Sequence, residues 1–409
     1  MATDERPERQ ERPERLSRNV YVVSAVSFLQ DTASEILYPV LPFFVTGVLG
    51  APPAVLGLIE GLADGTASAM KVLSGRLADL RHRRPLVGAG YGISAFGKLL
   101  LALAFAWPMV LVARVTDRVG KGLRGPPRDA IIADETTPAN RGRAFGFHRA
   151  ADTAGAVVGP LLGLALYELV GQRFRPLFWL AIVPAVLSAL LVLLIHERPH
   201  PHRRDALPWA PRQLPSRYWR VMGFIGLFAL VNFPDTLLLL RAKDLGVGFA
   251  GVTFLYVLYN LAYAALSYPA GRFSDRLGRR LVFGLGMAVF SVVYLGFGLT
   301  DGPGWLWVLL PLYGAYTALT DGVSRAWVAD LVPATDRATA LGIHAAISGV
   351  GLLVAGVWAG LAWNGTGHGP FVVSGVAVAV LSVVLLAAGR FFDGPPTRPA
   401  PPSPARAAT

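Results

Sequence analysis

The chain has 409 residues, of which 53% are hydrophobic and only 16% charged, and its formal net charge is +12. An average soluble domain has roughly 25% charged residues, so this composition predicts a polytopic helical membrane protein. Cysteine is absent, which excludes disulfides, thiolate nucleophiles and thiolate metal sites. The basic residues lie between apolar segments, where retention on the cytoplasmic side of a membrane explains them better than nucleic-acid binding does.

Residues 1–17 hold an imperfect Glu-Arg-Pro-Glu-Arg repeat and no apolar core, which predicts a disordered cytoplasmic tail rather than a signal peptide. Twelve apolar segments follow, each long enough for the roughly 20 residues that a spanning helix needs. They lie at 18–47, 53–78, 85–106, 107–130, 142–169, 175–196, 218–241, 250–271, 279–300, 305–330, 336–363 and 370–391. The predicted units are the tail, two six-helix bundles at 18–197 and 217–391, a cytoplasmic linker at 198–216 rich in Pro, Arg and His, and a Pro-rich cytoplasmic tail at 392–409.

Basic residues mark every second connection between these segments, around Arg83, Arg141, Arg203, Arg279 and Arg337. The other connections are short and mostly neutral. Because cytoplasmic loops carry an excess of Lys and Arg, both termini are expected on the cytoplasmic side of the inner membrane.

An internal repeat relates the two halves at a constant offset of 196 residues. The matched identities are Gly75/Gly271, Arg76/Arg272, Asp79/Asp275, Arg83/Arg279, Arg84/Arg280, Asp134/Asp330, Arg141/Arg337, Ala144/Ala340, Gly146/Gly342, His148/His344 and Gly155/Gly351. Two parallel six-helix halves of this kind are the plan of many secondary transporters.

One repeated loop carries a family resemblance. Between the second and third segments stands Gly75-Arg-Leu-Ala-Asp79-Leu-Arg-His-Arg83-Arg84, and its second copy is Gly271-Arg-Phe-Ser-Asp275-Arg-Leu-Gly-Arg279-Arg280. These resemble the Gly-x-Leu-Ala-Asp-Arg-x-Gly-Arg-Arg loop of the major facilitator superfamily, over nearly the whole chain. The resemblance implies an all-helical membrane fold of twelve transmembrane helices in two pseudo-symmetric bundles. It also implies a gating role for Gly75, Asp79, Arg83, Gly271, Asp275 and Arg279, with each aspartate bracing an outward-facing state.

Two further patterns resemble the same family. Arg118-Val-Gly-Lys121-Gly122 is similar to a fourth-helix Arg-x-x-Gln-Gly pattern linked to proton coupling, with Lys121 in place of Gln. The second resemblance is to a fifth-helix pattern associated with antiporters, mainly drug exporters, and it lies at Gly155, Gly159, Pro160 and Gly163. Independently of any family, glycines repeated every four residues predict close helix packing, and the proline predicts a kink.

The fourth segment carries a charged stripe. At ~100° per residue, one helix face holds Arg114, Asp117, Arg118, Lys121 and Arg128. A charge at a bilayer centre costs at least ~2.5–3.5 kcal/mol, so this face must meet partner groups or water rather than lipid. Pro126-Pro127 is expected to end the helix before Arg128.

Many charges of the first half have neutral counterparts in the second half. Glu60, Asp64, Lys71, Lys98, Arg114, Asp117, Arg118, Arg149 and Asp152 correspond in the second half to Tyr256, Asn260, Ser267, Tyr294, Leu310, Tyr313, Gly314, Ala345 and Ser348. The first half is therefore predicted to handle protons, with Asp31, Glu35, Glu60, Asp64, Asp117 and Asp152 as carriers. The alternative for any one pair is a static ion pair that fixes helix register. The predicted substrate cavity is lined by Lys71, Lys98, Arg114, Arg118, Lys121, Arg149, Asn232, Asp235, Tyr256, Asn260, Asp321 and Arg325.

The sequence thus predicts a monomeric secondary transporter that works by alternating access and exports a small molecule, a drug or a metabolite, in exchange for protons. The alternatives are a carrier for an anionic metabolite bound by the first-half Arg/Lys cluster, and an exporter of a divalent metal. An enzyme or a non-transporting receptor is disfavoured, because neither a nucleophile–base constellation nor a soluble domain is visible. No cofactor or bound metal is expected, and the absence of a Gly-x-x-x-x-Gly-Lys-Ser/Thr motif argues against ATP.

Overall fold

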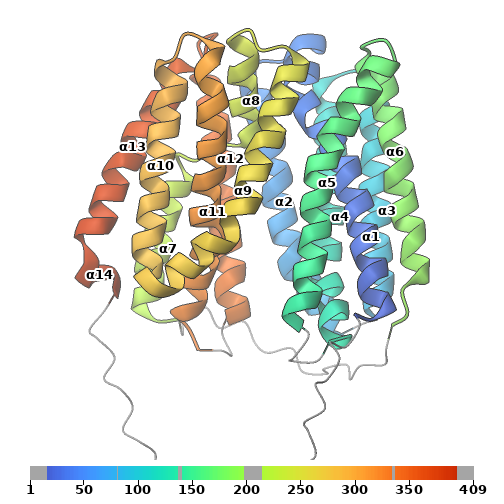
Figure 1. The fold of residues 1–409 in the computed structure, drawn as a ribbon, viewed down its shortest axis with the longest axis horizontal. Coiled ribbons are helices and arrows are strands. Elements are labelled where there is room, and N and C mark those ends of the chain that lie inside the picture. The colour runs from blue at the N-terminus through green and yellow to red at the C-terminus, as the bar shows by residue number, and fades with distance from the viewer. Residues whose placement is uncertain (1–15, 81, 137–140, 198–213, 334–336, 394–409) are drawn as a thin grey trace, which may run out of the picture.

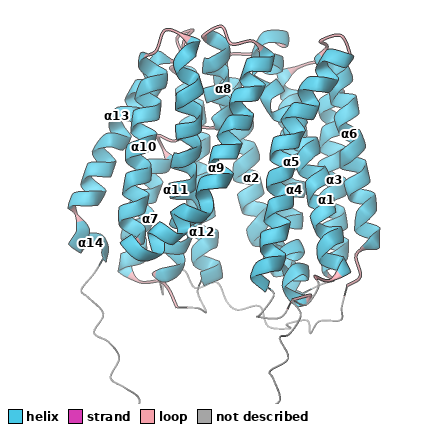
Figure 2. Cartoon of the chain, in the orientation of Figure 1, coloured by secondary structure: helices cyan, strands magenta, loops and turns pink. Residues whose placement is uncertain are grey.

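The computed structural model describes residues 16–80, 82–136, 141–197, 214–333 and 337–393. The predicted tails and linker lie largely outside the described residues. The first half contains α1 (Arg18–Leu37), α2 (Pro53–Leu80), α3 (Arg83–Ala102), α4 (Trp107–Asp134), α5 (Arg141–Leu169) and α6 (Phe174–Leu191). The second half contains α7 (Ser216–Ala229), α8 (Asp235–Asp244), α9 (Phe249–Leu277), α10 (Arg279–Leu299), α11 (Leu306–Asp330), α12 (Arg337–Leu361), α13 (His368–Ala387) and the short α14 (Gly389–Asp393). All these elements are helical, as Figure 2 shows.

Each predicted apolar segment coincides with helical structure, and the seventh is broken. It consists of α7 and α8, separated by non-helical residues that end at Pro234, the residue before α8 begins. Proline lacks an N–H group and cannot continue a helix from the preceding turn, which explains the break. The first segment is also irregular at its end, because α1 passes through a 3-10 turn (Tyr38–Val40) into a π-helical stretch (Phe43–Val48).

The expectation that Pro126-Pro127 ends the fourth helix was wrong. Both prolines lie inside α4, which continues to Asp134. A proline at position 126 removes the helical donor for the carbonyl of Gly122, four residues earlier. That carbonyl instead accepts a hydrogen bond of 2.8 Å from the Ser74 hydroxyl of α2. The neighbouring helix thus satisfies the group that proline leaves free, as is usual for proline in membrane helices.

Among the described helices, seven are long and apolar enough to cross a bilayer on length and composition alone, namely α3, α5, α6, α9, α10, α12 and α13. The charged α4 packs between α2 and α3, and the charged α2 packs between α4 and α12. Charged helices need such a position, because lipid cannot solvate ionised side chains.

The two halves lie side by side in Figure 1 and meet chiefly where α2 packs against α12 and α5 against α9. Glycines bring the first pair of helices together: a Cβ atom placed on Gly57 would lie 2.1 Å from the carbonyl oxygen of Gly356. On Gly360 it would lie 2.3 Å from the Cα atom of Ala54. The two backbones are therefore in direct contact where α2 begins and α12 ends.

The bundle has a basic end and an opposite end. The basic end is where α2 meets α3 and α9 meets α10, at Arg83, Arg84, Arg279 and Arg280, and it lies at the bottom of Figure 1. The opposite end is where α8 meets α9.

Candidate functional site

A network of three cations and three carboxylates fills the space between α2, α3 and α4. Arg114 donates two hydrogen bonds of 2.8 Å to the carboxylate of Glu60. Arg118 lies with its Nε atom 3.3 Å from Oδ1 of Asp64. Lys98 donates a hydrogen bond of 2.9 Å to Asp117, whose second oxygen is 3.9 Å from Arg114. The charges balance, three against three.

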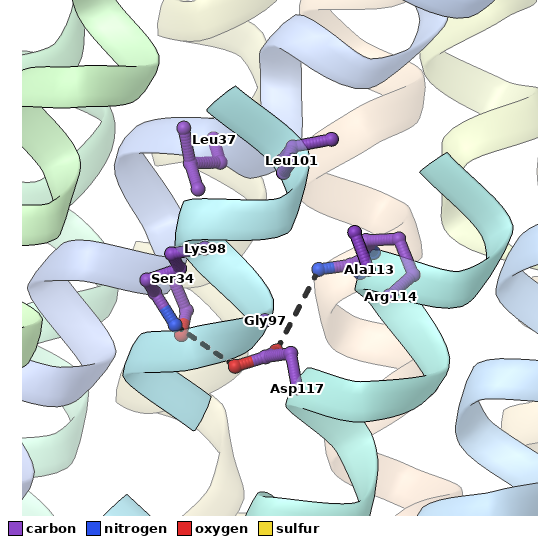
Figure 3. Close-up of a pocket in the computed structure, with 8 residues that line it drawn as sticks. All are labelled: Ser34, Leu37, Gly97, Lys98, Leu101, Ala113, Arg114 and Asp117. Atoms are coloured by element: carbon purple, nitrogen blue, oxygen red, sulfur yellow. Dashed lines mark hydrogen bonds and ion pairs between the residues drawn. The ribbon is translucent and has the colours of Figure 1, made fainter. Parts of the chain in front are cut away.

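The part of this network around Glu60, Lys98 and Arg114 is closed to ligands, whereas the Asp64 side chain is 41% exposed. Glu60 is 0% exposed and Arg114 3%. The cavity beside Lys98, Arg114 and Asp117 has a volume of about 10 Å³, roughly the space of one water molecule. Figure 3 shows these side chains directed at one another across that cavity. The predicted substrate residues Lys98, Arg114 and Arg118 are thus already engaged by carboxylates of the same half.

A second cluster of charges lies closer to the basic end, where α1, α4 and α5 meet. Asp152 has its Oδ2 atom 3.6 Å from His148, 3.9 Å from Arg149 and 4.0 Å from Arg128. Arg128 also donates a hydrogen bond of 2.8 Å to Ser27 of α1. Asp31, one turn further along α1, has neither a hydrogen bond nor an ion pair within the described part of the chain, although it lies in the field of Asp152 and Lys121.

The halves are joined by a hydrogen bond between a carboxylate and a phenol. Tyr256 of α9 donates a hydrogen bond of 2.7 Å to Oε2 of Glu35 on α1, and the ring of Tyr38 stacks on Tyr256 with centroids 5.2 Å apart. Glu35 has no cation within ion-pair distance among the described residues. It is therefore a carboxylate at the boundary between the two bundles, held only by a neutral donor.

The second half has tyrosines where the first half has charges. Asp235 accepts hydrogen bonds from Tyr313 at 2.6 Å and from Tyr259 at 3.2 Å, and Asn232 donates one of 2.9 Å to Tyr316. Asn260 is turned away from this group, because its amide donates to the Tyr256 carbonyl of its own helix. Sequence comparison of the halves identified Tyr256 and Tyr313 but missed Tyr259 and Tyr316; their helical spacing of three from those two was the available signal.

Asp321 and Arg325 pair with each other along α11 at 2.6 Å, as their spacing of four residues suggested. Tyr263 of α9 also donates a hydrogen bond of 3.0 Å to Asp321. Arg325 itself remains exposed.

Exposed cations lie toward the basic end of the boundary between the halves, and aromatic contacts cross the boundary at the opposite end. Lys71 of α2, Lys121 of α4 and Arg149 of α5 are exposed, and exposed charges within a membrane bundle require water rather than lipid around them. At the opposite end the ring of Phe249 contacts Phe43 and Tyr167, with centroids 5.6 and 4.7 Å away. These aromatic contacts cross from α9 to the first half and seal that end.

Comparison with known proteins decides the family. The family model described as Major Facilitator Superfamily matches residues 23–240 and 221–408. The chain belongs to the major facilitator superfamily. It is 34% identical over 379 residues to an uncharacterised transporter of this superfamily from Methanocaldococcus jannaschii, covering 91% of this chain and 95% of that one. It is 29% identical over 301 residues to the multidrug resistance protein MdtH of Aeromonas hydrophila, covering 71% and 74%.

The fold has counterparts among solved structures of the superfamily. The crystal structure of the nucleoside transporter NupG matches with a TM-score of 0.78 at 15% identity, covering 90% of this chain and 99% of that one. The chain is accordingly a multi-pass membrane transporter with the all-helical fold of the superfamily, not an enzyme, and its substrate class is a small molecule.

The repeated loops of the superfamily make the same ion pair in both halves. Arg83 pairs with Asp134, and Arg279, 196 residues later, pairs with Asp330 at 3.1 Å. Asp275 lies 2.6 Å from Arg279 of its own loop. The side chain of Asp79 lies outside what the structure describes, and the glycines of the two loops, Gly75 and Gly271, have no neighbour closer than 3.9 Å to an added Cβ atom.

The glycines of the fifth helix hold α5 against α1. Added Cβ atoms would lie 3.0 Å from Asp31 Cβ for Gly155, 2.7 Å from Glu35 Cβ for Gly159, and 3.0 Å from the Ile36 carbonyl oxygen for Gly163. Pro160 is accommodated inside α5. The close packing predicted from the spacing is present, and its partner is the helix that carries both α1 carboxylates.

Proposed function

We propose that this chain exports a small molecule across the cytoplasmic membrane in exchange for protons, with its basic end in the cytoplasm. The excess of Lys and Arg at that end supports the orientation. Substrate would then load from the cytoplasmic side, toward which the exposed cations lie. The relative named as a multidrug resistance protein supports export.

The observation that supports proton coupling is the hydrogen bond between Glu35 and Tyr256. A carboxylate can release or accept a proton in a low-dielectric site when no cation fixes its charge. Glu35 meets that condition, and its donor belongs to the other half. Separation of the halves removes the donor and changes the environment of the carboxylate. Proton binding and the movement of the halves are thereby linked.

The other carboxylates divide into two groups. Asp31 and Asp235 resemble Glu35, because neither has a cation partner among the described residues. Glu60, Asp64 and Asp117 are each paired with a cation of their own half, and Asp152 lies among three basic side chains. We assign proton transfer to Asp31 and Glu35, with Asp235 as a third candidate. The paired carboxylates maintain the register of the helices.

The test is transport in liposomes that contain the purified protein, with a panel of fluorescent drugs and an imposed pH gradient. We expect gradient-driven flux of at least one drug in the wild type, and flux without dependence on the gradient in Glu35→Gln. Glu168→Gln is the matched control, because Glu168 is an exposed carboxylate at the opposite end of α5. Unchanged gradient dependence in Glu35→Gln, Asp31→Asn and Asp235→Asn would refute the assignment.

A further inference from the structure

Two exposed lysines, on α2 and α4, have no counter-charge of their own. Lys71 of α2 and Lys121 of α4 are exposed, and neither side chain makes a hydrogen bond or an ion pair within the residues that the structure describes. This separates them from Lys98, Arg114 and Arg118, each of which forms an ion pair with a carboxylate of the first half. Unpartnered cations at membrane depth are costly and are functional candidates for that reason.

The two lysines are neighbours because α2 and α4 pack closely at Gly122. A Cβ atom on Gly122 would lie 3.2 Å from the backbone nitrogen of Lys71, and the Ser74 hydroxyl binds the Gly122 carbonyl at 2.8 Å. Lys71 and Lys121 therefore start from adjoining points on two locked helices, and their charges act on each other. Two like charges held together in this way are stabilised when an anion lies between them.

Lys121 lies near the middle of the membrane-spanning length. It is the fifteenth residue of a 28-residue helix, about 20 Å from either end at 1.5 Å per residue. An exposed ammonium group at that depth must line an aqueous cavity that reaches the basic end. A ligand bound there would lie between the halves, where a transporter of this superfamily must hold its substrate in order to release it on the other side.

Further charges around the lysines come from both halves. The positive charge of Arg118 repels both lysines electrostatically, and that of Arg325 of α11, in the second half, repels Lys71. The carboxylates that attract the Lys121 ammonium group electrostatically are Asp31, Asp64 and Glu35. Asp64 already forms an ion pair with Arg118, at 3.3 Å. Asp31 and Glu35 are the groups that we assign to proton transfer. When these two are protonated, the cavity carries an excess of positive charge.

We propose that Lys71 and Lys121 together bind the carboxylate or phosphate group of a small organic anion, and that this anion is the transported substrate. The inference rests on the proposed transport function but not on proton coupling. It places the anion site at the exposed lysine pair instead of the buried Arg/Lys network, and Arg325, which is paired with Asp321, adds positive charge from the second half. An inside-negative membrane potential would favour export of such a substrate.

The experiment is ligand-induced thermal stabilisation of the purified full-length protein in detergent, because a ligand of the folded state raises its apparent stability. The probes are benzoate, inorganic phosphate and the lipophilic cation tetraphenylphosphonium. Lys71→Gln/Lys121→Gln removes both charges, and Lys71→Arg/Lys121→Arg retains them. Arg276→Gln is the matched control, because it removes an exposed cation of α9 at the basic end.

We expect benzoate, phosphate or both to stabilise the wild type, the Arg variant and the Arg276→Gln control. We expect at least about tenfold weaker anion affinity in the double Gln variant, since hydrogen bonds between charged groups are lost. Comparison of benzoate with phosphate distinguishes a carboxylate site from a phosphate site. Stabilisation by tetraphenylphosphonium alone, or equal anion affinity in the double Gln variant, would overturn the inference.

The two proposals fail separately. Gradient-driven transport of a cationic drug, with no anion binding, would retain proton-coupled export and eliminate the anion site. Anion binding that requires the lysines, without any effect of a pH gradient on flux, would retain the site and eliminate the coupling. If the double Gln variant does not fold, the Arg variant with Lys71→Gln alone and Lys121→Gln alone gives the same comparison.

Discussion

Removing one member of the Glu60–Arg114 pair should destabilise the protein far more than removing both. Glu60→Leu leaves three cations, Lys98, Arg114 and Arg118, facing two carboxylates. It also removes two hydrogen bonds of 2.8 Å from a buried guanidinium group. Hydrogen bonds to charged groups contribute about 1.5–3 kcal/mol each, and breaking a buried ion pair costs about 3–5 kcal/mol. We therefore expect Glu60→Leu, and likewise Arg114→Leu, to lower the free energy of unfolding by about 3–5 kcal/mol.

The double variant removes one charge of each sign. It leaves Lys98 paired with Asp117 and Arg118 with Asp64, so the remaining network is neutral. We expect a total cost of about 1–2 kcal/mol for imperfect packing, and hence, with single costs of about 3–5 kcal/mol each, a coupling energy of at least about 4 kcal/mol. The second half already provides a neutral version of the pair, because the equivalent positions are Tyr256 and Leu310.

The measurement is equilibrium unfolding in mixed detergent micelles with increasing dodecyl sulfate, followed by circular dichroism. The matched cycle is Asp321→Leu with Arg325→Leu, an exposed pair on one helix, for which a coupling of no more than about 0.5 kcal/mol is expected. If the costs of Glu60→Leu and Arg114→Leu simply add, the two residues do not stabilise the fold as a pair, and our account of the network is incorrect.

Three further predictions concern helix packing. Gly57→Ala places a methyl group 2.1 Å from the backbone of α12 and should cost about 1–3 kcal/mol in unfolding free energy, whereas Gly125→Ala, which meets open space, should cost nothing; equal melting temperatures would contradict this. Ser74→Ala leaves a carbonyl of α4 without its donor and should cost about 1–3 kcal/mol, measured in the same unfolding assay; a loss below about 0.5 kcal/mol would count against our account of the proline-containing helix. Gly159→Ala displaces α1 at its carboxylates and should alter the gradient dependence of transport in liposomes, while Gly146→Ala on the same helix, which has no neighbour, should not; identical behaviour of the two would refute a role for this packing in coupling.

The helices were predictable because a membrane imposes one rule on every span. Each segment must be about 20 residues long and mostly apolar, so apolar runs located the helices to within a few residues. The rule does not locate interruptions inside a span. The break before Asp235 and the continuation of α4 past Pro127 depend on which neighbours satisfy the backbone. For Gly122 that neighbour is Ser74, 48 residues away in the chain.

The charges of the site were predictable, but their partners were not. Helical periodicity placed Arg114, Asp117 and Arg118 on one face, and an intramembrane charge requires a partner or water. Which one it receives depends on the register of three helices. Arg114 pairs with Glu60 of α2 and Asp117 with Lys98 of α3, while Lys121 on the same stripe is exposed. A single sequence contains no information on distances between helices. Cations that are paired with carboxylates therefore could not be distinguished from cations that are unpaired.

The distinction between paired and unpaired charges bears on how coupling can work. In alternating access, two bundles move largely as rigid bodies. A carboxylate whose partners all lie in one bundle keeps those partners in both states, so its proton affinity has little reason to change. Glu60 and Asp117 are in that position. Glu35 is not, because its donor Tyr256 belongs to the other bundle. A proton can drive the movement only through a group that the movement affects, and therefore the boundary, rather than the most heavily charged helix, is where coupling belongs.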